Sequence, residues 1–302
     1  MAEDGEDRLE FIQETDEKYN LQDLLSSDAK LMGKGNLGNT YKAFLKIGEV
    51  VAVKRFKGQF AYGISKENLQ ELGQVSHENL LPFKAYMFSK HQQLLVYDYM
   101  PMGSLYSLLH GGKDRTNLNW KTRMKVAYGV ACGIDHIHKR GRGVCHGNIR
   151  SSNIFLDESC VVKISEFGIP QLFGKVKMSS EYRAPEVKRA SQQGDVYSFG
   201  VLVLELCTGK DLVNEEEGFS LAKWVRLMFQ ENAIIDVFYE GLRVYNKKKT
   251  GMQMVQLLEL AICCTFENPK KRPLISAVVK RIEEVLCLFI SCSKKSQNVL
   301  NI

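Results

Sequence analysis

Gly33-Lys34-Gly35-Asn36-Leu37-Gly38 is followed, further along the chain, by Val51-Ala52-Val53-Lys54. These two stretches are the first evidence for the fold. Three glycines at this spacing let backbone N–H groups approach phosphate oxygens closely. In a dinucleotide-binding fold the third glycine would open a helix. Here Thr40-Tyr41-Lys42-Ala43-Phe44 follows instead, a stretch typical of a strand. The glycine loop is therefore predicted to join two strands.

Lys54 ends the β-branched run Val50-Val51-Ala52-Val53, which predicts a buried strand. Its ammonium group could neutralise the phosphates of a nucleotide held by the glycine loop. The simpler interpretation is an ordinary lysine on an edge strand. The order of glycine loop, strand and lysine favours the phosphate role, and motifs further along the chain support it.

Three more motifs follow in order: His146-Gly147-Asn148-Ile149-Arg150-Ser151-Ser152-Asn153, Glu166-Phe167-Gly168 and Ala184-Pro185-Glu186. Asp195 and Arg272 come after them. Together with the loop and Lys54, these motifs resemble those of the protein kinase family, whose patterns are H-R-D-L-x-x-x-N, D-F-G and A-P-E. The resemblance implies an α+β, two-lobed protein-kinase fold. It has a β-rich N-lobe with an αC helix and a mainly helical C-lobe.

Other segments narrow the resemblance to one branch of that family. Residues 19–25, 95–105 and 195–201 are similar to plant leucine-rich-repeat receptor-like kinases, and the similarity runs from about residue 19 to about residue 287. It implies an N-lobe over residues 19–100 and a C-lobe over residues 101–290. An acidic flexible arm is expected over residues 1–18, because residues 1–17 carry eight acids and one base. Residues 291–302 are expected to form a disordered tail.

Composition limits the possible environments. Hydrophobic residues make up 44% and charged residues 25%, as in soluble globular proteins. The net charge of +6 is mild and predicts no nucleic-acid partner. The eight cysteines form no C-x-x-C pair, so a reducing compartment is expected. No stretch predicts a signal peptide or a direct membrane span. We expect a cytoplasmic protein that a receptor partner recruits to the inner face of the plasma membrane.

Helical periodicity begins at Trp120, with Asn119 as the expected N-cap. Residues 195–208 are apolar on nearly every side and predict a helix at the centre of the larger lobe, capped by Asp195 and ended by Gly209. His138 is expected on a helix surface.

The catalytic loop departs from the family pattern. Asn148 stands where the resemblance places the catalytic Asp, and an amide has no charge and almost no basicity. Loss of a positioned general base costs about 10²–10⁴ in rate. Gly147 replaces an arginine that pairs, in many kinases, with a phosphorylated activation loop. The remaining catalytic candidate in this loop is Arg150, and no intact catalytic set is predicted.

The metal-binding and αC positions are also altered. Glu166 replaces the metal-binding Asp, and its extra methylene should displace the carboxylate, while Mg²⁺ demands near-octahedral geometry. Asn153 matches the second metal ligand, so a degenerate site with weak or absent Mg²⁺ binding is expected. The αC glutamate position falls on Asn68. Glu67 and Glu71 lie nearby on another face, and either could reach Lys54 only after a shift.

The activation segment is short. Only fifteen residues, 169–183, separate the Glu-Phe-Gly and Ala-Pro-Glu motifs, which leaves little room for a peptide-binding platform. Ser179 and Ser180 could be phosphorylated by a partner, although exposed serines are usually ordinary loop residues.

These departures predict an inactive receptor-like kinase that acts as a nucleotide-binding scaffold or partner-binding module. Its expected partners are receptor-like kinases or other signalling proteins. The alternative is a slow ATP-dependent serine/threonine kinase, because phosphoryl transfer relies mainly on positioning and electrostatics. ATP is the expected cofactor, with Tyr97 at the back of its cleft. The residues predicted to bind the nucleotide are Met32, Gly33, Lys34, Gly35, Gly38, Thr40, Ala52, Lys54, Asp98 and Met100.

Overall fold

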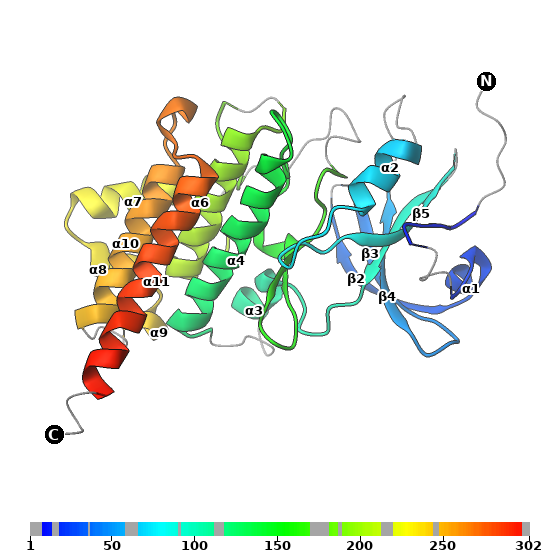
Figure 1. The fold of residues 1–302 in the computed structure, drawn as a ribbon, viewed down its shortest axis with the longest axis horizontal. Helices are drawn as coiled ribbons and strands as arrows, with labels where there is room; N and C mark the ends of the chain where they lie inside the picture. Colours follow the sequence, from blue (N-terminus) through cyan, green and yellow to red (C-terminus); the bar gives the residue numbers. More distant parts are fainter. Residues whose placement is uncertain are drawn as a thin grey trace.

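The computed structural model describes residues 8–13, 18–35, 37–57, 66–89, 92–111, 118–169, 181–186, 189–212, 220–243 and 248–297. Side chains of residues 248, 249 and 288–297 lie outside this description. Ser179 and Ser180 also fall outside it, so their predicted exposure is not addressed. The described residues form a sheet-rich lobe and a helical lobe, as Figure 1 shows, which confirms the predicted two-lobed α+β fold.

The smaller lobe contains an antiparallel sheet with the strand order β1-β5-β6-β4-β3-β2, six strands within the described residues. The strands are β1 (Glu10–Phe11), β2 (Asp28–Lys34), β3 (Gly38–Phe44), β4 (Val50–Phe56), β5 (Phe83–Phe88) and β6 (Gln93–Asp98). Helices α1 (Leu21–Leu25) and α2 (Lys66–Gly73) accompany this sheet. The glycine loop joins β2 to β3, as predicted.

Strand β4 holds the centre of this sheet because its residues suit a buried strand. Val51 and Val53 are buried in one apolar cluster with Ala85 of β5 and Val96 of β6. Phe56 and Lys54 are buried as well. The pairing register sets Lys54 opposite Leu95 of β6 on one side and Thr40 of β3 on the other. The position of this lysine is therefore determined by the strand ladder.

The larger lobe is helical, with a two-stranded sheet of β7 (Ile154–Leu156) and β8 (Val162–Ile164) between it and the smaller lobe. Its elements are α3 (Leu105–His110), α4 (Trp120–Lys139), α6 (Gln192–Thr208), α7 (Leu221–Gln230), α8 (Ile234–Val237), α9 (Glu240–Arg243), α10 (Lys248–Cys264) and α11 (Ile275–Gln297), with short 3-10 turns η3 (Ser151–Asn153) and η4 (Pro269–Lys271).

Helix α6 forms the centre of this lobe, and α4, α7 and α10 pack around it. Fourteen of its seventeen residues are buried, which confirms the prediction from its apolar sequence. Asn119 caps α4 by accepting a hydrogen bond from the Thr122 backbone N–H at 2.9 Å, as predicted. Gly209 ends α6 with φ of +67°, a conformation that glycine adopts without steric cost. No helix among the described residues has the length and apolarity needed to cross a membrane.

Three sequence predictions need correction. Part of the acidic arm expected over residues 1–18 is ordered, because β1 pairs with β5 and Leu9 is buried. The tail expected from residue 291 continues as helix to Gln297. The N-cap of α6 is Ser191, not Asp195, which lies in the first turn and makes other hydrogen bonds described below.

Candidate functional site

The glycine loop is a tight connection between β2 and β3. The Gly35 backbone N–H donates to the Gly38 carbonyl at 2.8 Å, and the strand register shifts between Leu31 and Gly33. A Cβ atom at Gly38 would overlap the backbone carbonyl of Arg55, so only glycine fits there. The outer strand β2 is exposed along its whole length.

The residues predicted to bind a nucleotide lie on neighbouring strands. Thr40 pairs with Gly33 on one side and Lys54 on the other, and Ala52 pairs with Tyr97. The set is distributed as follows: Met32, Gly33 and Lys34 on β2, Gly35 after it, Gly38 and Thr40 on β3, Ala52 and Lys54 on β4, and Asp98 and Met100 at the end of β6 and just beyond. The fold therefore brings the predicted set together, and its role in binding stays a prediction.

Lys54 pairs with Glu166 rather than with a residue of α2. Its Nζ contacts Glu166 Oε1, and both residues are 8% exposed. The αC candidates Glu67, Asn68 and Glu71 are exposed on α2. The charge of Lys54 is therefore balanced from the opposite lobe, by the residue at the metal-ligand position.

Glu166 is held by both of its carboxylate oxygens. While Oε1 contacts Lys54, Oε2 accepts a hydrogen bond from Asn148 Nδ2 at 2.8 Å. Burial by itself would raise the pKa of Glu166, but the charge and hydrogen bond of Lys54 outweigh it and lower the pKa below its usual value. The backbone of Glu166 has φ of +66°, which non-glycine residues rarely adopt. The contacts of Glu166 therefore favour its ionised form.

Asn148 occupies the place of a catalytic base, and its contacts are those of a structural donor. Its amide NH₂ donates to Glu166, and its backbone carbonyl accepts from Asn153 Nδ2 at 3.0 Å. The bond to a carboxylate identifies this end of the side chain as the NH₂ group, because a carboxylate can only accept. Asn148 thus binds the neighbouring side chains and offers no basic atom for proton removal.

The catalytic loop is supported from beneath by Asp195. Its carboxylate accepts from the backbone N–H groups of His146 at 2.7 Å and Gly147 at 2.8 Å, and it contacts His138 Nε2 at 2.9 Å. The His138 side chain, expected on a helix surface, is only 9% exposed, because it packs against Asp195 of α6. His146 is fully buried, and this burial lowers the pKa of its imidazole. Arg150 lies in the same loop, before η3.

A divalent metal does not fit the residues present. The ligands implied by the resemblance are Glu166 and Asn153, but both oxygens of Glu166 are already bonded to protein donors. The described residues also contain no cluster of three acidic, histidine or cysteine side chains that could hold a metal ion. Mg²⁺ dehydrates reluctantly, and at Glu166 it would have to share the carboxylate oxygens with Lys54 and Asn148.

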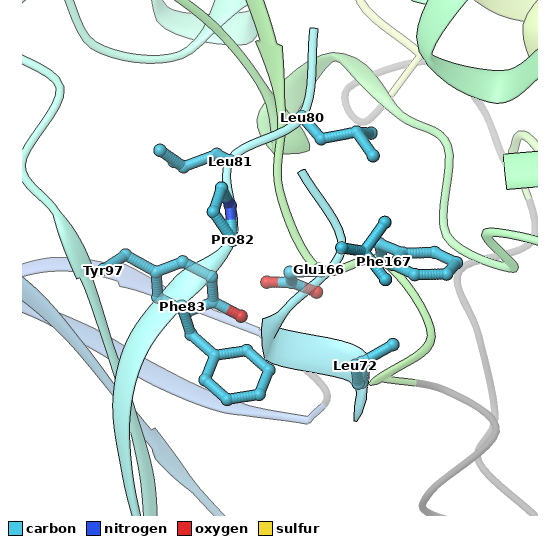
Figure 2. Close-up of a pocket in the computed structure, with 9 residues that line it drawn as sticks. Leu72, Leu80, Leu81, Pro82, Phe83, Tyr97, Glu166 and Phe167 are labelled. Atoms are coloured by element: carbon cyan, nitrogen blue, oxygen red, sulfur yellow. The ribbon is translucent and has the colours of Figure 1, made fainter. Parts of the chain in front are cut away.

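A small cavity lies behind Tyr97, between the two lobes. Figure 2 shows Glu166 reaching into it between Tyr97 and Phe167. The cavity is small and partly open to solvent, and its walls are otherwise apolar: Leu72, Val75, Leu80, Leu81, Pro82 and Phe83. The Tyr97 hydroxyl is buried without a hydrogen-bond partner among the described residues. Burial and the charge of Glu166 raise the pKa of this phenol.

The Ala-Pro-Glu motif is anchored to the helical lobe. The guanidinium of Arg272 donates to both carboxylate oxygens of Glu186, at 2.6 and 2.8 Å, and its side chain is 0% exposed. The same guanidinium donates to the carbonyls of Phe266, Gln193 and Glu267. Burial would raise the pKa of Glu186, but the Arg272 hydrogen bonds lower it overall.

The sequence did not predict the partner of Lys54. Residues 54 and 166 are 112 positions apart, and only the docking of the two lobes brings them together. The bond from Asn148 to Glu166 was missed because it depends on how two loops of the larger lobe pack against each other. A single sequence carries no signal for either contact, because each depends on how separate segments of the chain pack together.

Two solved structures are similar to this fold. One is the pseudokinase domain of BIR2, described as an immune regulator of the RLK/Pelle family. It superposes with a TM-score of 0.79 at 28% identity, covering 93% of this chain and 90% of the other. The other is the kinase domain of maize SIRK1, a sucrose-induced receptor kinase, bound to AMP-PNP, with a TM-score of 0.79 at 25% identity over 92% and 99% of the two chains.

The fold and site thus define a protein kinase domain with an altered catalytic centre. The model of the protein tyrosine and serine/threonine kinase family matches residues 27–282, and the chain belongs to this family. It is 43% identical, over 291 residues and 92% of its length, to a probable inactive receptor kinase of Arabidopsis thaliana. The chain spans 44% of that relative's length.

Proposed function

We propose that this chain is an inactive receptor-like kinase domain, a pseudokinase that signals by binding. The observation that carries the proposal is the 2.8 Å hydrogen bond from Asn148 Nδ2 to Glu166 Oε2. It points the NH₂ group of the base position toward the residue of the metal position. An incoming hydroxyl would therefore meet an amide, which is too weakly basic to take its proton.

The similarity to relatives supports this proposal. Inactivity is part of the name of the Arabidopsis relative, and pseudokinase is part of the description of the BIR2 domain. The bonds that hold the fold together are retained, as between Arg272 and Glu186. A domain that keeps its framework while losing its chemistry is suited to recognition.

A phosphorylation assay tests the catalytic part of the proposal. The purified chain is incubated with labelled ATP and Mg²⁺ or Mn²⁺, and incorporation into itself and into a generic protein substrate is measured. Incorporation should equal that of a Lys54→Ala control, because no residue accepts the substrate proton. Turnover that clearly exceeds this control would contradict the proposal and favour a slow kinase.

The double variant Asn148→Asp with Glu166→Asp sharpens the assay. It restores the family's base and metal ligand without touching the glycine loop. A strong gain in incorporation would place the defect in these two side chains. If incorporation stays at the level of the control, the defect lies elsewhere in the fold, for example in α2 or the short activation segment.

We further propose that the cleft binds a nucleotide and that the domain works beside signalling partners such as receptor-like kinases, in the cytoplasm or at the inner face of the plasma membrane. The strand ladder that aligns Thr40, Ala52 and Lys54 supports nucleotide binding. A ligand at 100 times its Kd should stabilise the folded chain by about 2.7 kcal/mol. A melting temperature unchanged by ATP would contradict this part. Partners are tested by affinity capture with the intact chain and mass spectrometry.

A further inference from the structure

Lys54, Glu166 and Asn148 form a closed chain of contacts across the cleft. Lys54 comes from the sheet, Asn148 from the catalytic loop and Glu166 from the segment after β8. The side chains of Lys54 and Glu166 are each 10% exposed, so the pair is largely shielded from water. A phosphate group entering here has to compete with Glu166 for the same ammonium group.

A magnesium ion would ordinarily relieve this competition, because it binds the acidic side chain and the phosphates together. In this chain the acidic side chain already receives a donor on each oxygen. The amide of Asn153, the other ligand position, donates its Nδ2 hydrogen to the Asn148 carbonyl. The positive charge that balances Glu166 is thus supplied by the protein itself.

From this arrangement we propose that nucleotide binding at this cleft is independent of divalent metal and is opposed by the carboxylate of Glu166. The proposal rests on the nucleotide binding proposed above and deepens it. The ammonium group of Lys54 can bind either the Glu166 carboxylate or a phosphate of the nucleotide. Glu166 therefore competes with the nucleotide for this cation. Asn148 completes the arrangement because it occupies the second carboxylate oxygen.

The test uses the full chain and a fluorescent ATP analogue, mant-ATP, titrated with excess magnesium chloride or with EDTA. The Kd of the wild-type chain should agree within about twofold in the two buffers. The Glu166→Gln variant should bind about tenfold more tightly in EDTA, because Lys54 is released for the phosphates. A matched control, Glu158→Gln, removes the same charge from the exposed turn between β7 and β8 and should bind like the wild type.

A second variant keeps the test decisive if Glu166→Gln folds poorly, which thermal melting would reveal. Asn148→Asp combined with Glu166→Asp rebuilds a pair of carboxylates and should acquire binding that is about tenfold tighter with magnesium than with EDTA. If this variant shows no metal dependence, the assignment to these two side chains is wrong.

The outcomes separate this inference from the proposed function. Wild-type binding that magnesium strengthens several-fold would overturn metal independence and leave nucleotide binding intact. A Glu166→Gln variant that folds and binds no more tightly would overturn the competition. If the wild-type chain and both variants bind no mant-ATP in either buffer, nucleotide binding itself fails, while the proposal of a non-catalytic domain stands on its phosphorylation assay.

Discussion

The cleft between the lobes and the framework beneath it use buried charges in opposite ways. In the framework, Asp195 and Arg272 bind backbone groups and the Glu186 carboxylate, and these are contacts that hold loops in place. In the cleft, Lys54, Asn148 and Glu166 bind one another. These three side chains stand at positions where the family binds or acts on a ligand, but here their polar groups are bonded to one another. The comparison shows that the framework contacts of the fold are present while the polar groups of the cleft bind one another.

The framework contacts should matter most for stability. Arg272→Ala would leave Glu186 and three backbone carbonyls without their donor, at a cost of about 3–5 kcal/mol. Urea unfolding followed by circular dichroism measures this loss. As a control, Arg281→Ala breaks an exposed pair with Glu284 and should change stability by less than about 1 kcal/mol. Equal effects of the two variants would show that the Arg272 network is not a structural anchor.

The ion pair in the cleft should contribute less, because Asn148 still donates to Glu166 when Lys54 is removed. Lys54→Met leaves the Glu166 carboxylate buried with only the Asn148 donor, and we expect a loss of about 2 kcal/mol. Adding Glu166→Gln should recover most of this loss, because the uncompensated charge is removed. Urea unfolding of both variants gives the comparison. A Lys54→Met chain as stable as the wild type would mean that the pair contributes nothing to folding.

Substitutions of two glycines, one in the helical framework and one in the cleft, compare how tightly these two regions are packed. A Cβ at Gly200 of α6 would lie 2.7 Å from Thr265 Cγ2 and 2.8 Å from Cys264 Cβ, so Gly200→Ala should cost about 1–2 kcal/mol. A Cβ at Gly33 in the cleft meets no atom within 4 Å, and Gly33→Ala should change stability by about 0.5 kcal/mol or less. Thermal melting distinguishes them. The reverse order would mean that the α6–α10 contact is looser than described.

Lowering the pH should decrease the free energy of unfolding in two steps, and little stability should be lost near neutral pH. Burial lowers the pKa of His146, so the folded state stays unprotonated while the unfolded state gains a proton as the pH falls below about 6.5. The pKa values of Glu166 and Glu186 are lowered too, so a second loss begins below about 4.5.

Urea unfolding at several pH values between neutral and acidic measures these two losses. The free energy of unfolding should fall with pH in both ranges, because the unfolded state binds protons first in each. The pKa of His77 is also lowered, mainly by partial burial. A His77→Asn variant removes this second histidine, so that the remaining pH dependence can be assigned to His146. Stability that is flat between pH 7 and pH 5 in this variant would contradict a buried, neutral His146.

Short-range features of the fold were readable from the sequence. The strand over Val50–Phe56, the N-cap at Asn119 and the C-cap at Gly209 were predicted because each depends on neighbouring residues alone. The order of the motifs predicted the two lobes for a different reason, since it matches a family pattern. The departures at Asn148 and Glu166 were visible for the same reason.

The errors concern contacts between distant parts of the chain. The acidic composition of the N-terminal arm predicted disorder, yet Glu10 accepts from Tyr86 and pairs with Lys66, which holds β1 on the sheet. Asp195 was interpreted as a helix cap, but its carboxylate supports a loop that lies 49 residues earlier in the sequence.

The sequence by itself determined which groups are present in the cleft: an ammonium, an amide and a carboxylate where the family has a lysine and two aspartates. Only the tertiary structure decided that these three bind one another, because their meeting depends on how a strand of one lobe docks on two loops of the other. Local patterns specify backbone conformation and residue chemistry, whereas the partner of a buried charge is set by long-range packing.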